Sequence, residues 1–350
     1  MINKTNPGNF FEDFRLGFEF RHGAPRTVTE GDIALYGALY GSRFALTSSS
    51  EFAAASCGLP SRPVDDLLVF HLVFGKSVPD ISVNAVANLG YAEGRFSTLV
   101  HAGDTVHATS KVIGLKENAN RQTGIVHVRT SGYNQQGETV LDFVRWVMVR
   151  KRDPNAETGP SDVPETAPFV PPDRLIVPDG LNFGHYDPVM GGSPHFWEDY
   201  SAGERIDHID GMTIEEAEHM LATRLYQNSA KVHFNQHAEA SGRFGRRLVY
   251  GGHIISIARA LSFNGLGNAV KIAAINGGRH VAPCFGGDTI YAWSRIEAAW
   301  ELPGRPDIGA LRIKSFAAKD HPCGDFPGDA ETHPQLVLEF DYTVLMPRRF

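Results

Sequence analysis

Runs of alternating hydrophobic and polar residues recur in both halves of the chain. In the first half they cover residues 105–115, 125–132 and 139–150, and in the second half residues 289–298, 310–317 and 336–346. Alternation with a period of two is typical of strands that bury one face, so these runs predict antiparallel strands. The sequence Asn134-Gln135-Gln136-Gly137 indicates a hairpin turn between two of them.

Two kinds of helix precede the strands in each half. One begins at a polar residue and covers residues 29–40 or 214–226, with Thr29 and Thr213 as the expected N-caps. The other, at residues 67–75 or 253–261, is apolar around most of its circumference, which predicts a buried helix. A buried helix wrapped by long antiparallel strands is an α+β arrangement, the hotdog fold.

The two halves also share short sequence matches in the same order. The segment 11–14 (FEDF) corresponds to 197–200 (WEDY), and Leu39-Tyr40 corresponds to Leu225-Tyr226 at the same spacing. Two later matches, of 103–105 with 287–289 and of 140–143 with 337–340, follow at similar spacings. Ordered matches indicate a duplicated domain with small insertions, so we predict a double hotdog.

A proline-rich stretch separates the two copies. Seven prolines fall between Pro154 and Pro178, among Asp, Glu and Gly residues. Proline lacks a backbone N–H and favours extended backbone, so this stretch predicts a semi-rigid linker. We expect an N-terminal hotdog domain at residues 9–152, the linker at 153–194, and a C-terminal hotdog domain with the active site at 195–350.

Composition narrows the class of protein. The 350 residues suffice for two domains with sizeable cores, since 42% of them are hydrophobic. A net charge of −7 argues against a nucleic-acid partner, which requires a basic face. The three cysteines include no Cys-x-x-Cys pair, which favours reduced thiols over disulfides or a zinc ribbon. No signal peptide or apolar span of about 20 residues is visible, so we expect a cytoplasmic protein without a membrane partner.

One loop, at residues 226–233, carries two side chains suited to proton chemistry. His233 has an ordinary pKa near neutrality, so it can take or give a proton. Asn228 can donate and accept hydrogen bonds at once and so hold a water molecule. The pair suggests chemistry with water, and an exposed loop histidine without a function is the alternative.

The segment 246–253 leads into the second apolar helix. Gly251 and Gly252 lie at the start of this helix, where the first N–H groups have no partner within the helix. These groups and the helix dipole could stabilise negative charge on a thioester oxygen that becomes an enolate. A glycine pair that only permits a tight turn is the alternative.

These two segments resemble the MaoC-like hydratases, also called R-specific enoyl-CoA hydratases. That family carries Asp-x-Asn-Pro-x-His in a loop and His-Gly at the start of the buried helix. His233 matches the motif histidine and Gly251 matches the glycine. Asn228 stands in place of the aspartate, Ala230-Lys231 in place of Asn-Pro, and Tyr250 in place of the second histidine.

Longer segments, from about Phe11 onward, are similar to the mesaconyl-CoA hydratases. They include DDLLVFHLVFGKSVPDISVNAVANLGYAEGRF and VIGLKENANRQTG. The resemblance implies reversible hydration of mesaconyl-CoA (2-methylfumaryl-CoA) to β-methylmalyl-CoA. Coenzyme A would be part of this small-molecule substrate, and no metal or redox cofactor would be required. His233 would carry the proton, Asn228 would hold the water and Gly251 would donate to the thioester oxygen, with Tyr250 and Gly252 in contact with the substrate.

The free carboxylate of this substrate requires a cation. Lys231, Arg247 and Arg279 are the candidates, and Arg95 is the counterpart of Arg279 in the first copy. Each of them could instead face solvent or the phosphates of coenzyme A. The first copy aligns Thr47 with His233, so we expect this half to have lost the chemistry and to line the cleft.

Two other functions remain open. Asp65-Asp66 precede the apolar helix of the first copy, near the place where hotdog thioesterases carry a catalytic carboxylate, so thioester hydrolysis is one alternative. Favourable charge at a helix N-terminus is the simpler role for both residues. Non-catalytic binding of acyl-CoA is the other alternative. His233 and His237 lack a third ligand, so we expect no metal site, and exposed sheet edges predict a homodimer.

Overall fold

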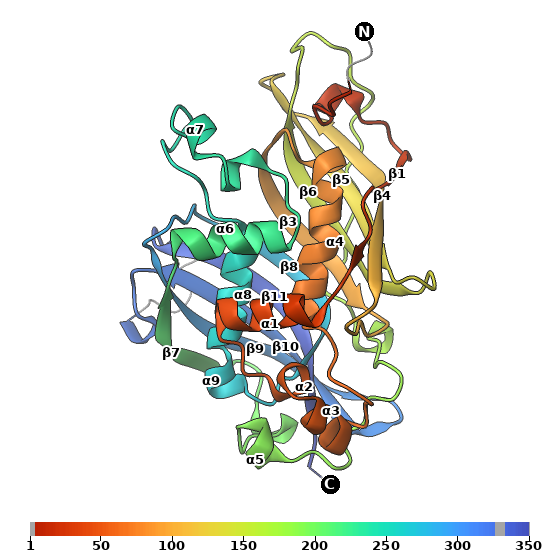
Figure 1. Ribbon diagram of the computed structural model, residues 1–350, viewed down its shortest axis with the longest axis vertical. Coiled ribbons are helices and arrows are strands. Elements are labelled where there is room, and N and C mark those ends of the chain that lie inside the picture. Colours follow the sequence, from red (N-terminus) through yellow and green to blue (C-terminus); the bar gives the residue numbers. More distant parts are fainter. Residues whose placement is uncertain (1–3, 326–332, 350) are drawn as a thin grey trace.

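The computed structural model describes residues 4–325 and 333–349 of the chain (Figure 1). The first half contains α1 (Glu30–Tyr40), α2 (Ala45–Ser48), α3 (Ser50–Cys57), α4 (Asp66–Ile81), β1 (Glu19–Arg21), β2 (Arg26–Thr27), β3 (Ala85–Phe96), β4 (Thr105–Glu117), β5 (Thr123–Tyr133) and β6 (Thr139–Arg150). The second half contains α5 (Pro188–Gly191), α6 (Glu216–Leu225), α7 (Gln236–Glu239), α8 (Gly251–Leu261), α9 (Phe263–Leu266), β7 (Arg205–Thr213), β8 (Lys271–His280), β9 (Thr289–Leu302), β10 (Arg305–Lys319) and β11 (Leu336–Pro347). Short 3-10 helices lie at Phe11–Asp13, Pro172–Arg174, Trp197–Asp199, Lys231–His233 and Cys323–Asp325. Within the described residues, no helix is long and apolar enough to cross a bilayer.

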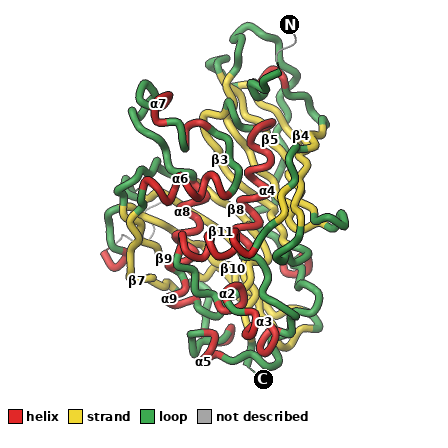
Figure 2. The backbone as a smooth tube through the Cα atoms, viewed as in Figure 1, coloured by secondary structure: helices red, strands yellow, loops and turns green. Residues whose placement is uncertain are grey.

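The strands form a single antiparallel sheet. Their order is β1-β4-β5-β6-β3-β8-β11-β10-β9-β7, and β2 pairs with β4. Read outward from the centre, β3-β6-β5-β4-β1 matches β8-β11-β10-β9-β7, so the second half repeats the topology of the first. Figure 2 shows the strands running through the molecule as one layer, with the longer helices in front of them.

The hotdog helices are α4 and α8. Contacts join α4 to β4, β5 and β6, and α8 to β9, β10 and β11. Nearly every residue of both helices is buried, as expected for helices that are apolar around most of their circumference. The α+β double hotdog predicted from the sequence is confirmed.

The smaller helices α1 and α6 contact each other beside these two (Figure 1). Thr29 caps α1 as predicted, because its side chain accepts a hydrogen bond from the Asp32 N–H. The predicted cap Thr213 is wrong, since it is the last residue of β7 and α6 begins only at Glu216.

Strands β3 and β8 join the two halves. They pair in antiparallel register, with Tyr91 opposite Gly278 and Arg95 opposite Ala274. The hydrophobic pattern does not predict these two strands, because glycines interrupt their alternation, for example Gly94 and Gly277. The seam between the halves is therefore a feature that the structure adds.

A buried polar network connects the helices of the two halves. The Tyr40 hydroxyl lies 2.6 Å from the Tyr226 hydroxyl and 2.8 Å from His253 Nδ1. His71 Nε2 lies 2.9 Å from the Ser256 hydroxyl. Because buried polar groups are costly without partners, these contacts favour one arrangement of α4 against α8.

Buried neutral histidines make the fold sensitive to acid. Burial lowers the pKa of three of them to about 4 and of a fourth to about 3: His208, His233, His280 and His253. In the unfolded chain these histidines titrate near pH 6.5. Between pH 6.5 and about 4 the unfolded state therefore binds more protons, and the free energy of unfolding falls as the pH is lowered. Burial also raises the pKa of Asp65 to about 6, so this carboxyl group is protonated in the folded protein at pH 5 and releases its proton on unfolding. That release offsets the uptake by one histidine.

Burial also lowers the pKa of His71 well below its ordinary value. We therefore expect unfolding near pH 5 to take up about four protons, counted by linkage from these five histidines less Asp65. Urea unfolding between about pH 5 and 6.5 measures this number from the slope of the free energy against pH. An uptake below one proton would contradict the burial of neutral imidazoles.

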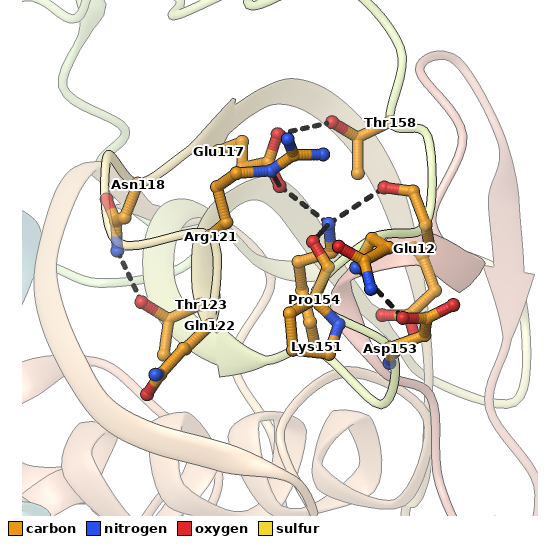
Figure 3. Close-up of polar contacts among 12 residues, drawn as sticks. Glu12, Glu117, Asn118, Arg121, Gln122, Thr123, Lys151, Asp153, Pro154 and Thr158 are labelled. Atoms are coloured by element: carbon orange, nitrogen blue, oxygen red, sulfur yellow. Dashed lines mark hydrogen bonds and ion pairs between the residues drawn. The ribbon is translucent and has the colours of Figure 1, made fainter.

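The proline-rich segment begins against the first half (Figure 3). The buried Lys151 ammonium donates to Glu117 Oε1 at 2.6 Å and to the carbonyl oxygens of Pro154 and Ala156 at 3.2 and 2.8 Å. Farther along, an isolated bridge pairs Asp162 with Leu115 of β4. These contacts hold the start of the predicted linker to the surface of the first half.

Candidate active site

A cavity of about 440 Å³ lies between the two halves of the chain. Its first-half wall comes from α4, β3 and β6 and includes Phe74, Tyr91 and Arg145. Its second-half wall comes from the loop after α6 and the start of α8 and includes His233 and Tyr250. Cavities of this size between domains are common ligand sites.

His233 is held in this wall as a neutral base. It ends the short 3-10 helix and is half-buried, with its ring 5.5 Å from the Tyr250 ring. Its Nδ1 lies 2.9 Å from the carbonyl oxygen of Leu248, which can only accept, so Nδ1 carries the proton and donates it. Nε2 has no protein partner among the described residues. Burial lowers the pKa of His233 to about 4, so at neutral pH this nitrogen has a free lone pair.

Asn228, five residues before His233, lines the same cavity. The side chain is buried, and its Oδ1 accepts the Ala230 N–H at 3.0 Å. This contact fixes the amide and leaves its Nδ2, which has no partner in the described part of the chain, to donate to a water molecule. An asparagine cannot take a proton there, so His233 is the only base of this loop.

The start of α8 also faces the cavity. Gly251 is the first residue of the helix and belongs to the cavity wall, and the N-cap residue, Tyr250, makes no side-chain hydrogen bond to the first turn. A Cβ atom at Gly251 would overlap the His280 ring, and one at Gly252 would overlap the Tyr250 ring. Crowding therefore requires both glycines, and the first-turn N–H groups lie at the cavity. Gly252 itself is buried behind the wall.

His280, at the end of β8, is a site residue that sequence reasoning missed. Its ring packs on Gly251 and its Nε2 lies 3.2 Å from the Tyr91 hydroxyl. Burial, with a smaller contribution from His233, lowers the pKa of His280 to about 4, so the two imidazoles are neutral neighbours. Recognising β8 as a strand would have placed His280 at its end, but the Gly277-Gly278 pair hides that strand.

The cations expected from the sequence do not line the cavity. Lys231 is exposed, although it lies two residues from His233. Arg247 pairs with Glu216 at 2.5 Å, and Arg279 pairs with Glu339 from a side chain that is 52% exposed. The structure therefore does not bring Lys231, Arg247 or Arg279 to the site.

The carboxylates of the first copy also lie outside the cavity wall. Asp65 caps α4 and accepts the Leu67 N–H at 2.9 Å. Asp66 pairs with Lys271 and accepts the Ile272 N–H at 2.8 Å. Both have structural partners, and this arrangement does not favour a thioesterase.

Side chains that could bind a metal ion do not cluster in residues 4–325 and 333–349. Within these ranges no three His, Cys, Asp or Glu side chains lie together in a way that could hold a metal ion. His237 is exposed on α7, four residues after His233. Cys57, Cys284 and Cys323 are buried free thiols.

Comparison with known sequences identifies relatives over the whole chain. Residues 2–332 match the profile of the mesaconyl-CoA hydratase family. A protein from Chloroflexus aurantiacus named beta-methylmalyl-CoA dehydratase is 63% identical over 352 residues, which cover 100% of both chains. A mesaconyl-CoA hydratase from Cereibacter sphaeroides is 57% identical over 348 residues, which cover 99% of this chain and 100% of the relative.

Solved structures agree with this relationship. A MaoC domain dehydratase from Chloroflexus aurantiacus superposes with a TM-score of 0.96 at 62% identity, covering 99% of this chain and 100% of the other. A Mycobacterium tuberculosis protein described as a double hotdog has a TM-score of 0.74 at 26% identity, covering 97% and 99%. The chain belongs to the mesaconyl-CoA hydratase family.

Proposed function

We propose that the protein catalyses the reversible hydration of mesaconyl-CoA to β-methylmalyl-CoA. The names of the relatives supply the substrate and the product. The observation that carries the chemistry is the neutral His233, whose Nε2 is unpaired among the described residues in a cavity that also contains the start of α8.

The addition of water begins at His233. Nε2 takes a proton from a water molecule that the Asn228 amide holds. The water oxygen bonds to the β carbon of the enoyl thioester, and the electrons of the double bond move to the thioester oxygen. The Gly251 N–H donates to that oxygen as it becomes negative, a contribution of about 3–4 kcal/mol in known oxyanion holes.

The second step completes the product. Protonated His233 returns its proton to the α carbon, the enolate collapses, and the bond to coenzyme A stays intact. Dehydration follows the same path in reverse, with His233 removing the α proton. The thioester accepts the electrons itself, so this mechanism requires no metal or redox cofactor.

Some expectations from the sequence remain predictions. They are the cytoplasmic location, the homodimer, and the domain boundaries at 9–152, 153–194 and 195–350. The sheet ends at β1 and β2 on one side and at β7 on the other, and a homodimer could pair through either edge. The first copy would supply a wall of the cavity and no base, because Thr47, the residue aligned with His233, lies on α2 outside the cavity wall.

An equilibrium experiment tests the proposed function. The protein is incubated with mesaconyl-CoA in one tube and with β-methylmalyl-CoA in another, and both thioesters and free thiol are measured over time. We expect the same final mixture from both directions and no thiol release. Release of coenzyme A would instead favour a thioesterase, and no change in either tube would favour a binding protein.

A further inference from the structure

The first-half wall of the cavity contains a buried arginine that lacks an acidic partner. Arg145, on β6, is 0% exposed and lines the cavity. Its guanidinium donates to the hydroxyls of Ser77 at 2.8 Å and Ser82 at 3.4 Å and lies 4.3 Å from the Phe74 ring centroid. Its Nε has no hydrogen-bond partner, and no described carboxylate lies within ion-pair distance of it.

Burial lowers the pKa of Arg145 to about 10, which leaves the side chain charged at neutral pH. A buried charge without a counter-ion is strongly unfavourable, so natural proteins rarely retain one unless something else pairs with it. Most other arginines that the structure describes have a carboxylate partner. One example is Arg129 of β5, which pairs with Glu93 and Asp142.

A second unsatisfied group lies in the same wall. Both polar atoms of the Asn88 side chain are buried without a hydrogen-bond partner, and Asn88 lines the cavity with Arg145. Asn88 is on β3, and β3 pairs with β6, so the two residues come from adjacent strands. The unpaired donors of this wall are therefore Arg145 Nε and Asn88 Nδ2.

This wall lies close to the proposed base. Tyr91 is the cross-strand partner of Arg145, and its hydroxyl lies 3.2 Å from His280. On the other side, the Tyr250 ring centroid lies 5.6 Å from that of Phe74 and 5.5 Å from that of His233. Arg145 and His233 therefore line the same cavity, one from each half of the chain.

We propose that Arg145, assisted by Asn88, binds the free carboxylate of the substrate and so selects a dicarboxylic enoyl thioester over an uncharged one. This inference rests on the proposed function. In mesaconyl-CoA the carboxylate is bonded to the β carbon, the atom that water attacks. A cation that holds this carboxylate therefore also positions the β carbon against the water at His233.

The test uses binding, because binding does not require turnover. Methylsuccinyl-CoA keeps the skeleton and the carboxylate of the substrate but has no double bond, and its uncharged counterpart carries a methyl group in place of the carboxylate. We expect the wild type to bind the charged compound about 10- to 100-fold more tightly, as for one charge-assisted contact. Arg145→Gln should abolish this preference, and Arg145→Lys should keep part of it.

A matched control separates recognition from folding. Arg259 is also buried and lies over an aromatic ring, that of Phe44, but it donates to the Ala269 carbonyl and does not line the cavity. We expect Arg259→Gln to lower Tm and to leave the preference unchanged. Thermal melts of both variants and the wild type show whether each is folded, so a preference lost only in a folded Arg145→Gln variant is assigned to binding.

Two results would overturn the proposal. They are a wild type without a preference for the charged compound, and an Arg145→Gln variant that keeps the preference, including one that binds both compounds equally more weakly. Failure of the proposed function gives a different result. A wild type that prefers methylsuccinyl-CoA but does not convert mesaconyl-CoA would refute hydration and would still support the carboxylate site.

Discussion

Replacing His233 with alanine lowers kcat for mesaconyl-CoA by about 10³-fold, within the 10²–10⁴ range of general acid–base catalysis. The expectation follows from the site, where Asn228 cannot accept a proton and His233 Nε2 is the free lone pair beside it. Because the side chain is half-buried and donates only to the Leu248 carbonyl, its loss should affect kcat more than KM. Steady-state rates with mesaconyl-CoA measure the effect.

His237→Ala is the matched control for this variant. His237 is exposed on α7, four residues farther along the chain, so its removal should leave kcat within about two-fold of the wild type, as for a surface change. If His233→Ala retained near-normal kcat, His233 would have no part in proton transfer.

Replacing Gly75, in the first half of the chain, with alanine lowers both the stability of the protein and its kcat. Gly75 lies in α4. A Cβ atom there would overlap the carbonyl oxygen of Tyr226 and lie 3.5 Å from the backbone nitrogen of Asn228. The backbone that carries Asn228 would have to move away from α4, because the overlapping atom is rigid backbone. We expect Tm to fall by several degrees, from a loss of about 1–3 kcal/mol on overpacking, and kcat to fall at least about ten-fold.

Gly37→Ala provides the comparison, because Gly37 also lies inside a helix, α1, and a Cβ atom there meets nothing within 4 Å. This change should raise stability by about 0.5–1 kcal/mol through helix propensity and should leave kcat unchanged. Thermal melts and kcat values for both variants measure the difference. Equal Tm values for Gly75→Ala and the wild type would show that α4 does not hold the Asn228 loop.

Much of the fold follows from local patterns in the sequence. The six alternating runs fall within β4, β5, β6, β9, β10 and β11, and the two apolar segments fall within α4 and α8. These elements are predictable because each buries one face or its whole circumference. Strands β3 and β8 are not, because they cross the seam between the halves, where glycines such as Gly94 and Gly278 allow close approach. A Cβ atom at Gly94 would lie 2.8 Å from Ile275 Cβ of the neighbouring strand.

Some residues of the candidate site could be predicted from the sequence, and others could not. His233, Asn228 and Gly251 could be proposed from the sequence because two short segments, both within residues 226–253, carry all three. Arg145 could not, because it is an ordinary-looking position in an alternating strand and becomes part of the site only when β6 packs against α4. Lys231 was expected at the site because it is near His233 in the sequence, but the fold leaves it exposed.

Mass spectrometry of the product formed in water labelled with heavy oxygen tests the central claim most directly. If water adds to the β carbon in this cavity, mesaconyl-CoA gives an intact coenzyme A thioester with the label in the new hydroxyl group. The His233→Ala variant forms that product far more slowly. Label in a released carboxylate with free coenzyme A, or equal rates from the two proteins, would contradict hydration by His233.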